Sequence, residues 1–118
     1  MVLEKSGWED DLKEAIEKLA KVLAVNSDIS IVIEGHTDNV PLKGGSIKDN
    51  WDLSVMRATS VVRILMSSAN INPSRLIPSG RGEYQPLVVN TNSESKRKNR
   101  RIEIILSPNL DKLYRLID

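Results

Sequence analysis

The chain has 118 residues, a length typical of one domain with a single apolar core. Its 17 Lys and Arg nearly balance its 16 Asp and Glu, and a net charge of +1 gives no reason to expect a nucleic acid partner. Aromatic residues make up 3% of the chain and Phe is absent, which leaves few rings on which bases could stack. The lack of cysteine excludes disulfides, zinc–thiolate sites and thiol nucleophiles.

The apolar runs of the chain are too short for a membrane span, and no secretory signal is recognised after Met1. We expect a soluble domain, which is compatible with a parent protein anchored to a membrane through a segment outside this sequence. Residues 2–5 fit either a short strand or the cut end of a longer chain, and the sequence leaves both open.

The first predicted element is a helix. Ser6 and Glu9 have the spacing of a capping box, in which each side chain bonds the other residue's backbone amide. Asn26 is a plausible C-terminal stop. Between these ends, apolar residues recur with the period of a helix: Leu12, Ala15, Ile16, Leu19, Val22 and Leu23.

Residues 29–34 alternate between apolar and more polar positions, which predicts a half-buried strand that ends at Gly35. Asp38 follows just beyond the carboxyl end of this strand. Strand ends of this kind are common places for ligand sites in sheets that helices cover.

A second helix is predicted from a cap at Asp49 or Asn50 to about residue 68. Arg57 falls within an apolar stripe of this helix, in line with Leu53, Val61 and Leu65. A guanidinium beside a packed face needs a carboxylate or a bound anion. Asp38 and Arg57 are therefore the charged residues around which we organise the site.

The rest of the chain predicts two further strands and one helix. Residues 39–50 and 86–99 are interpreted as loops. Residues 75–79 are interpreted as a short strand, in which Pro78 suits an edge strand or a strand end because it cannot donate to a ladder. Residues 101–106 predict a strand inside the sheet. Residues 108–118 predict a short helix whose apolar stripe packs on the domain or, as an alternative left open, forms a homodimer.

This order of elements predicts an α+β sandwich, with one sheet and helices on one face. We assign residues 1–107 to the domain and residues 108–118 to a helical extension packed on it.

The residues also bear on three other chemistries. A glycoside hydrolase needs two carboxylates roughly 5–9.5 Å apart, whereas Glu34 and Asp38 would lie about 13 Å apart along an extended chain. A single His36 without cysteine leaves a transition metal short of ligands, so we expect a hydrogen-bonding turn residue there and no metal. The basic run at 96–101 could suit nucleic acid, but a solvated loop is the expected interpretation.

Four motifs in order along the chain carry a resemblance to a known family. They are GHTDNVP at 35–41, NWDLSVMRATSVV at 50–62, RLIPSGRGEYQP at 75–86 and KNRRIEI at 98–104. In these motifs the sequence resembles the OmpA C-terminal domain family, which includes peptidoglycan-associated lipoproteins and the periplasmic part of the flagellar stator protein MotB. The NWDLS form of the second helix looks closer to MotB.

The resemblance implies a β-α-β-α-β-β sandwich, with one mixed sheet, that binds peptidoglycan without catalysis and without a cofactor. In this family an aspartate and an arginine contact the diaminopimelate of a stem peptide, and they match Asp38 and Arg57. Further pocket positions match Thr37, Asn50 and Arg100. The implied location is the periplasm, tethered to the outer membrane, or to the inner membrane if the parent protein is a MotB-type stator.

The free end of diaminopimelate is a zwitterion, with an ammonium and a carboxylate on one carbon. Asp38 would hold the ammonium, and Arg57 would bind the carboxylate through two parallel hydrogen bonds, which lysine cannot form. The competing interpretation is an internal ion pair between Asp38 and Arg57 that closes the strand onto the helix. A resting pair that opens for the zwitterion would satisfy both.

Overall fold

The computed structural model describes residues 2–4, 8–42 and 45–108 of the chain. Its elements are β1 (Val2–Glu4), α1 (Trp8–Val25), β2 (Ile29–His36), α2 (Asn50–Ser68), a 3-10 turn η1 (Pro73–Arg75), β3 (Leu76–Gly80), α3 (Ser93–Asn99) and β4 (Arg101–Pro108). None of the helices described is both long and apolar enough to cross a bilayer.

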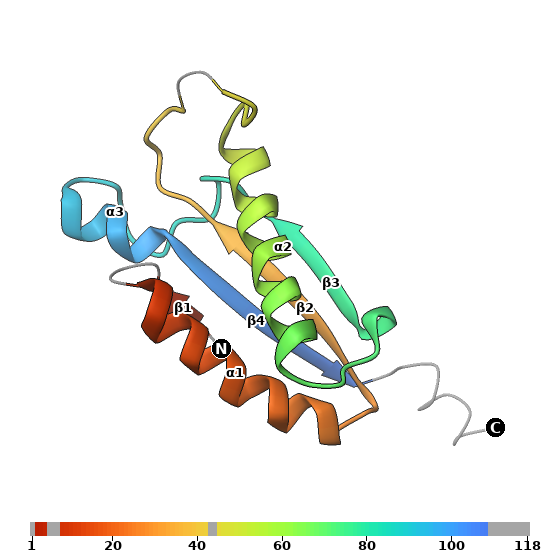
Figure 1. The fold of residues 1–118 in the computed structure, drawn as a ribbon. Coiled ribbons are helices and arrows are strands. Elements are labelled where there is room, and N and C mark those ends of the chain that lie inside the picture. Colours follow the sequence, from red (N-terminus) through yellow and green to blue (C-terminus); the bar gives the residue numbers. More distant parts are fainter. Residues whose placement is uncertain (1, 5–7, 43–44, 109–118) are drawn as a thin grey trace.

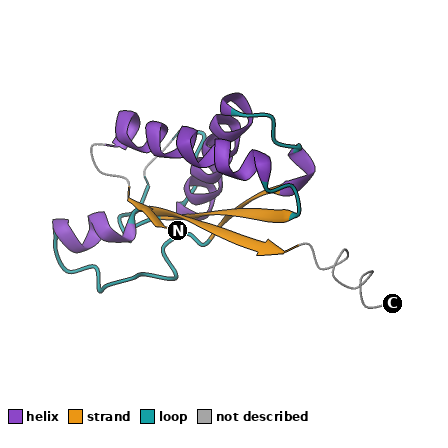
Figure 2. Ribbon diagram, turned by 90° about the horizontal axis from the view of Figure 1, so that it is seen from below, coloured by secondary structure: helices purple, strands orange, loops and turns teal. Residues whose placement is uncertain are grey.

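The four strands form one mixed sheet in the order β1-β4-β2-β3. β2 pairs with β3 in parallel and with β4 antiparallel, and β1 pairs antiparallel with β4. Helices α1 and α2 cover the same face of this sheet (Figure 1, Figure 2). The predicted α+β sandwich is therefore confirmed, and the residues at 2–4 form a strand.

The core lies between the sheet and the two long helices. Ile31 and Ile33 of β2 and Ile104 of β4 point toward the helices and are buried, as the alternation of these strands predicts. Helix α2 buries Val61 and Leu65 from the predicted stripe. β3 is an edge strand, as the proline in it indicated.

β2 is two residues longer than predicted, because Gly35 continues the strand and does not end it. Gly35 pairs with Ile102 on one side and Gly80 on the other. A Cβ built on Gly35 would lie 2.0 Å from the carbonyl oxygen of Ser54, so only glycine lets α2 approach the strand this closely.

The predicted loop at residues 86–99 is wrong in its last part, which forms α3. Asn92 caps this helix by accepting from the Ser95 amide at 2.8 Å, and the Ser95 hydroxyl accepts from the Asn92 amide at 3.0 Å. This reciprocal pair is a capping box with serine in place of the usual Glu or Gln, which is why the pattern was not recognised. α3 lies beyond the end of the sheet where β4 begins (Figure 1).

Two predictions lie outside what the structure describes. One is the capping box at Ser6 and Glu9, and the other is the helix beyond Pro108. Pro108 itself is the last residue of β4.

Candidate functional site

Asp38 lies two residues beyond the end of β2 and is 7% exposed. Its Oδ1 accepts from the backbone amide of Val40 at 3.0 Å. The hydroxyl of Thr37 donates to the Asp38 carbonyl at 2.8 Å. The carboxylate is thus held in one orientation by its own backbone turn.

Asn50 joins this turn to helix α2. Its side-chain amide donates to the carbonyls of Asp38 and Val40, each at 3.2 Å. Asn50 is the first residue of α2, and Asp49 caps the helix by accepting from the amide of Asp52 at 2.9 Å. Thr37, Asp38 and Asn50, all predicted as site residues, therefore lie together where α2 begins.

The ion pair of Asp38 is made by Arg100. Nη1 of Arg100 lies 2.6 Å from Oδ2 of Asp38, and Arg100 precedes the first residue of β4. The antiparallel register pairs His36 with Arg101, which brings the start of β4 beside the end of β2. The structure thus gives Asp38 a partner other than the Arg57 considered from the sequence.

Arg57 is half-buried on α2 and lies within electrostatic range of both Asp38 and Arg100. Its Nη1 is buried and has no hydrogen-bond partner in the described part of the chain. Burial lowers the pKa of the Arg57 guanidinium, the charge of Asp38 opposes this, and Arg100 adds to the lowering. The site therefore holds two guanidiniums for one carboxylate, with one guanidinium nitrogen unsatisfied.

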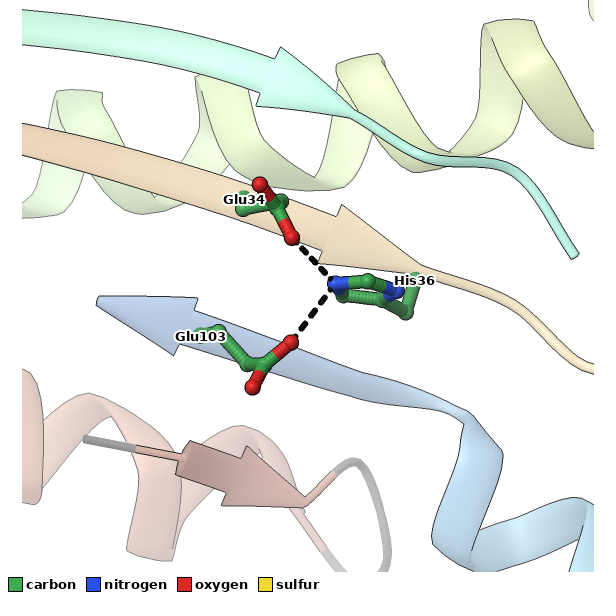
Figure 3. A group of neighbouring side chains, drawn as sticks. All are labelled: Glu34, His36 and Glu103. Carbon is green, nitrogen blue, oxygen red and sulfur yellow. Dashed lines mark hydrogen bonds and ion pairs between the residues drawn. The ribbon is translucent and has the colours of Figure 1, made fainter. Parts of the chain in front are cut away.

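A second charged cluster lies on the face of the sheet opposite α1 and α2 (Figure 3). Nε2 of His36 is 2.7 Å from Oε1 of Glu34 and 2.8 Å from Oε2 of Glu103. Arg81 lies 3.2 Å from the other oxygen of Glu34, and Arg101 lies 3.1 Å from Glu103. His36 is a buried strand residue that links β2 to β4, and not the turn residue expected from the sequence.

The pKa of His36 is lowered from its ordinary value of 6.5, first by burial and then by Arg101. Hydrogen bonding to Glu34 and the charges of Glu34 and Glu103 act in the opposite direction. With His36 neutral, two carboxylates balance two guanidiniums, so an added proton would leave a buried positive charge. The neutral ring then donates from Nε2 to the carboxylates.

The same three side chains have donor atoms within 4.8 Å of one another, close enough to surround a metal ion. Their carboxylates are already bound to Arg81 and Arg101, whose charges oppose a cation at this position. The chemistry of the cluster therefore fits an internal charge network better than a metal centre.

The basic run at residues 96–101 does not form one solvated patch. Arg100 binds Asp38, and Arg101 is 4% exposed with hydrogen bonds to backbone carbonyls. Asn99 is fully buried and its side chain holds the preceding segment through contacts with Leu87, Val88 and Asn90. Sequence reasoning missed Asn99, although it stands beside Arg100 in the KNRR motif.

Fold and site together define an α+β domain that gathers charged side chains at one end of a mixed sheet. Sequence comparison matches residues 5–100 to the OmpA family. The chain belongs to the OmpA family, as the four motifs predicted.

Three known proteins illustrate the similarity. Motility protein B of Bacillus subtilis is 36% identical over 92 residues, which is 78% of this chain and 35% of that protein. The periplasmic domain of Helicobacter pylori MotB superposes with a TM-score of 0.78 at 28% identity, over 98% of this chain and 78% of that one. The cell wall anchor of the T6SS from Pseudomonas aeruginosa superposes with a TM-score of 0.70 at 28% identity, over 81% of this chain and 66% of that one.

Proposed function

We propose that this domain binds peptidoglycan by holding the zwitterionic end of diaminopimelate among Asp38, Arg57 and Arg100, with Thr37 and Asn50 fixing the pocket. Membership of the OmpA family and similarity to a cell wall anchor support this class of partner. The parent protein would be tethered to a membrane and present the domain in the periplasm.

The observation that carries the proposal is Arg57. A half-buried guanidinium with an unpaired nitrogen is costly unless an anionic group completes its hydrogen bonds. Asp38 does not do so in this structure, where its Oδ2 lies 2.6 Å from Arg100 and its Oδ1 accepts from the Val40 amide. A ligand carboxylate matches the Arg57 guanidinium in shape and charge, and because Nη1 is buried, the surrounding side chains must shift to admit it.

The ammonium of the same ligand would approach Asp38. Because Arg100 already binds that carboxylate, the ammonium must share it with Arg100 or displace the guanidinium toward the ligand carboxylate. Arg100 is about one-third exposed and can move, whereas Asp38 is held by its backbone turn. The ion pair between Asp38 and Arg100 is therefore a resting state that the zwitterion rearranges.

We infer binding without catalysis. Glu34 bonds His36 and Arg81 on one face of the sheet, while Asp38 bonds Arg100 at its end. Two carboxylates engaged with separate cations are poorly suited to the paired acid and nucleophile of a glycosidase. Release of soluble muropeptides from purified walls by the domain would contradict this inference.

The test is titration of the domain with two stem peptides that differ in one residue, diaminopimelate or lysine. In both peptides the backbone amine of that residue is acylated, so only diaminopimelate keeps an ammonium and a carboxylate on one carbon. The diaminopimelate peptide should bind and the lysine peptide should not. Asp38→Ala and Arg57→Ala should each cost on the order of 2–5 kcal/mol of binding free energy, as expected when one partner of a buried charge contact is removed. Equal affinity for the two peptides would reject the site.

Arg63→Ala is the matched control, because Arg63 is an exposed arginine on the same helix. It should bind as the parent does. Circular dichroism should first establish that each variant is folded, and cosedimentation with purified walls should follow the same order of affinities.

A second candidate is the wall-anchoring domain of a MotB-type flagellar stator. The similarity to Motility protein B and to the MotB periplasmic domain favours it. Both candidates use the same pocket and differ in the rest of the parent protein. An upstream transmembrane helix that carries an aspartate would favour the stator, and a lipidated cysteine would favour the plain anchor in the outer membrane.

A further inference from the structure

Trp51 and Tyr84 form an exposed aromatic surface, here called the aromatic pair. Their ring centroids are 4.9 Å apart and the ring planes are inclined by 28°, so the two rings stack. Trp51 is 48% exposed and Tyr84 is 60% exposed. Rings of this size are mostly buried in folded proteins, and exposed aromatic surface often marks an interaction site.

The aromatic pair is held in place by the turn after β3. The Ser54 hydroxyl donates to the Trp51 carbonyl at 2.9 Å and accepts from the Gly82 amide at 3.0 Å. Gly82 has a φ of +60°, and a Cβ there would lie 3.2 Å from the Tyr84 ring and 3.5 Å from the Trp51 ring. Rings supported in this way lose little conformational entropy when a ligand binds.

The same contacts connect the aromatic pair to the candidate site. The Gly82 carbonyl accepts from the Thr37 amide at 2.9 Å. Asn50, whose side chain holds the Asp38 turn, immediately precedes Trp51 in α2. The aromatic pair and Asp38 are therefore supported by one framework at the same end of the sheet.

We propose that the aromatic pair binds a sugar ring of the glycan strand in peptidoglycan. One face of a pyranose ring consists of C–H bonds and packs on aromatic rings, while its hydroxyls bond polar groups such as those of Glu83 and Gln85 beside Tyr84. The inference rests on the proposed function, since two residues of stem peptide separate diaminopimelate from the sugar, a reach of roughly 10 Å.

The charge around the aromatic pair favours a sugar over a nucleobase, which would also stack. Asp52 follows Trp51 and Glu83 precedes Tyr84, and both are acidic. Nucleic acid binding depends on cations that neutralise phosphates, so these neighbours oppose it. A neutral sugar meets no such penalty.

Two probes test the proposal. One is the disaccharide N-acetylglucosaminyl-N-acetylmuramic acid with its lactyl carboxyl converted to the methylamide, so that the sugar is neutral, and the other is free diaminopimelate. The disaccharide should shift the indole N–H resonance of Trp51, which Trp51→Phe distinguishes from that of the other tryptophan in the chain. Trp51→Ala and Tyr84→Ala should each weaken disaccharide binding about tenfold, with the affinity for diaminopimelate within about twofold of the parent's.

Leu87→Ala is the matched control, because Leu87 is an exposed apolar residue of the same connection that is not in the aromatic pair. It should leave both affinities unchanged. If Trp51→Ala does not fold, Tyr84→Ala and Trp51→Phe carry the test, the latter with a smaller loss than tenfold.

The proposal is overturned if the disaccharide leaves the Trp51 resonance unmoved at millimolar concentration. It is also overturned if the ring variants lose affinity for diaminopimelate and disaccharide alike, because that pattern indicates a purely structural role. If the parent fails to bind diaminopimelate but binds the disaccharide through both rings, the proposed function is wrong and the sugar site remains.

Discussion

Arg57 is proposed to bind a ligand because one of its guanidinium nitrogens has no hydrogen-bond partner among the described residues. The helical period predicts that Arg57 lies within the apolar stripe of α2. Its unpaired Nη1 indicates that the guanidinium needs a hydrogen-bond acceptor. A guanidinium offers a planar fork of donors, whereas an ammonium offers a single charge centre. The identity of this cation should therefore matter as much as its charge.

Arg57→Lys separates these two properties. It keeps the positive charge and loses the paired hydrogen bonds, so diaminopimelate binding should weaken by about 1.5–3 kcal/mol. Isothermal titration calorimetry measures the change. Arg63→Lys on the exposed side of the same helix should have no effect, and full retention of affinity in Arg57→Lys would show that charge alone is recognised.

His36 should make stability depend on pH. Its pKa in the folded state is below the unfolded value of 6.5, so the unfolded chain takes up a proton first as the pH falls. The free energy of unfolding should therefore be highest above about pH 6.5 and decrease between this pH and the lower folded pKa, by at most about 1.4 kcal/mol per pH unit. Below the folded pKa it should level off, because both states are then protonated.

Urea unfolding at a series of pH values measures this dependence. Other groups titrate in the same range, so the informative quantity is the difference between the parent and His36→Gln, whose amide can still donate to the two carboxylates. The variant should lose the part of the slope that begins near pH 6.5. Identical slopes would exclude His36 as its source.

At the scale of elements, the contact between β2 and α2 positions the site. Gly35 lies against the backbone of Ser54, and Asn50 at the start of the same helix holds the Asp38 turn. The distance between strand and helix therefore sets the distance between Asp38 and Arg57. A change at Gly35 should act on the site through this spacing.

Gly35→Ala should destabilise the fold by about 3 kcal/mol, because a Cβ placed 2.0 Å from a carbonyl oxygen forces the helix away from the strand. Thermal unfolding measures it. Gly45→Ala is the comparison: its Cβ meets nothing within 4 Å, and its φ of +84° costs only about 1 kcal/mol. Equal destabilisation in the two variants would contradict the close approach.

At the scale of the whole molecule, Arg75 closes the end of the fold that is opposite the site. Its guanidinium donates to the carbonyls of Leu23 and Ile29, both at 2.9 Å, and to that of Asn26. Because Arg75 immediately precedes β3, these bonds join the end of α1 and the start of β2 to the start of β3. Lysine cannot span these carbonyls with one side chain.

Arg75→Ala should lower the free energy of unfolding by about 2–3 kcal/mol, because the carbonyls at the end of α1 lose a charged donor. Chemical denaturation measures this change. Diaminopimelate affinity should stay at the parent's value, since Arg75 lies at the far end of the sheet. A parallel loss of affinity would mean that the two ends are coupled.

The sequence by itself predicted α1, β2, α2, β3 and β4 and most of their buried faces, because the alternation of strands and the period of helices are local properties. Val22 of the predicted face of α1 is exposed, and β1 was left open. It indicated that Pro78 lies on an edge strand and that Asp38 follows a strand end. It missed α3, whose capping box uses serine in place of Glu or Gln.

Only the tertiary structure decided how the charges are paired. Asp38 and Arg100 are 62 positions apart, and they meet because β4 runs antiparallel beside β2 and starts where β2 ends. Which guanidinium takes the carboxylate depends on this long-range register, which the local pattern around neither residue contains. The pairing leaves the half-buried Arg57 with an unpaired nitrogen, and this is the physical basis for the ligand that we propose at the site.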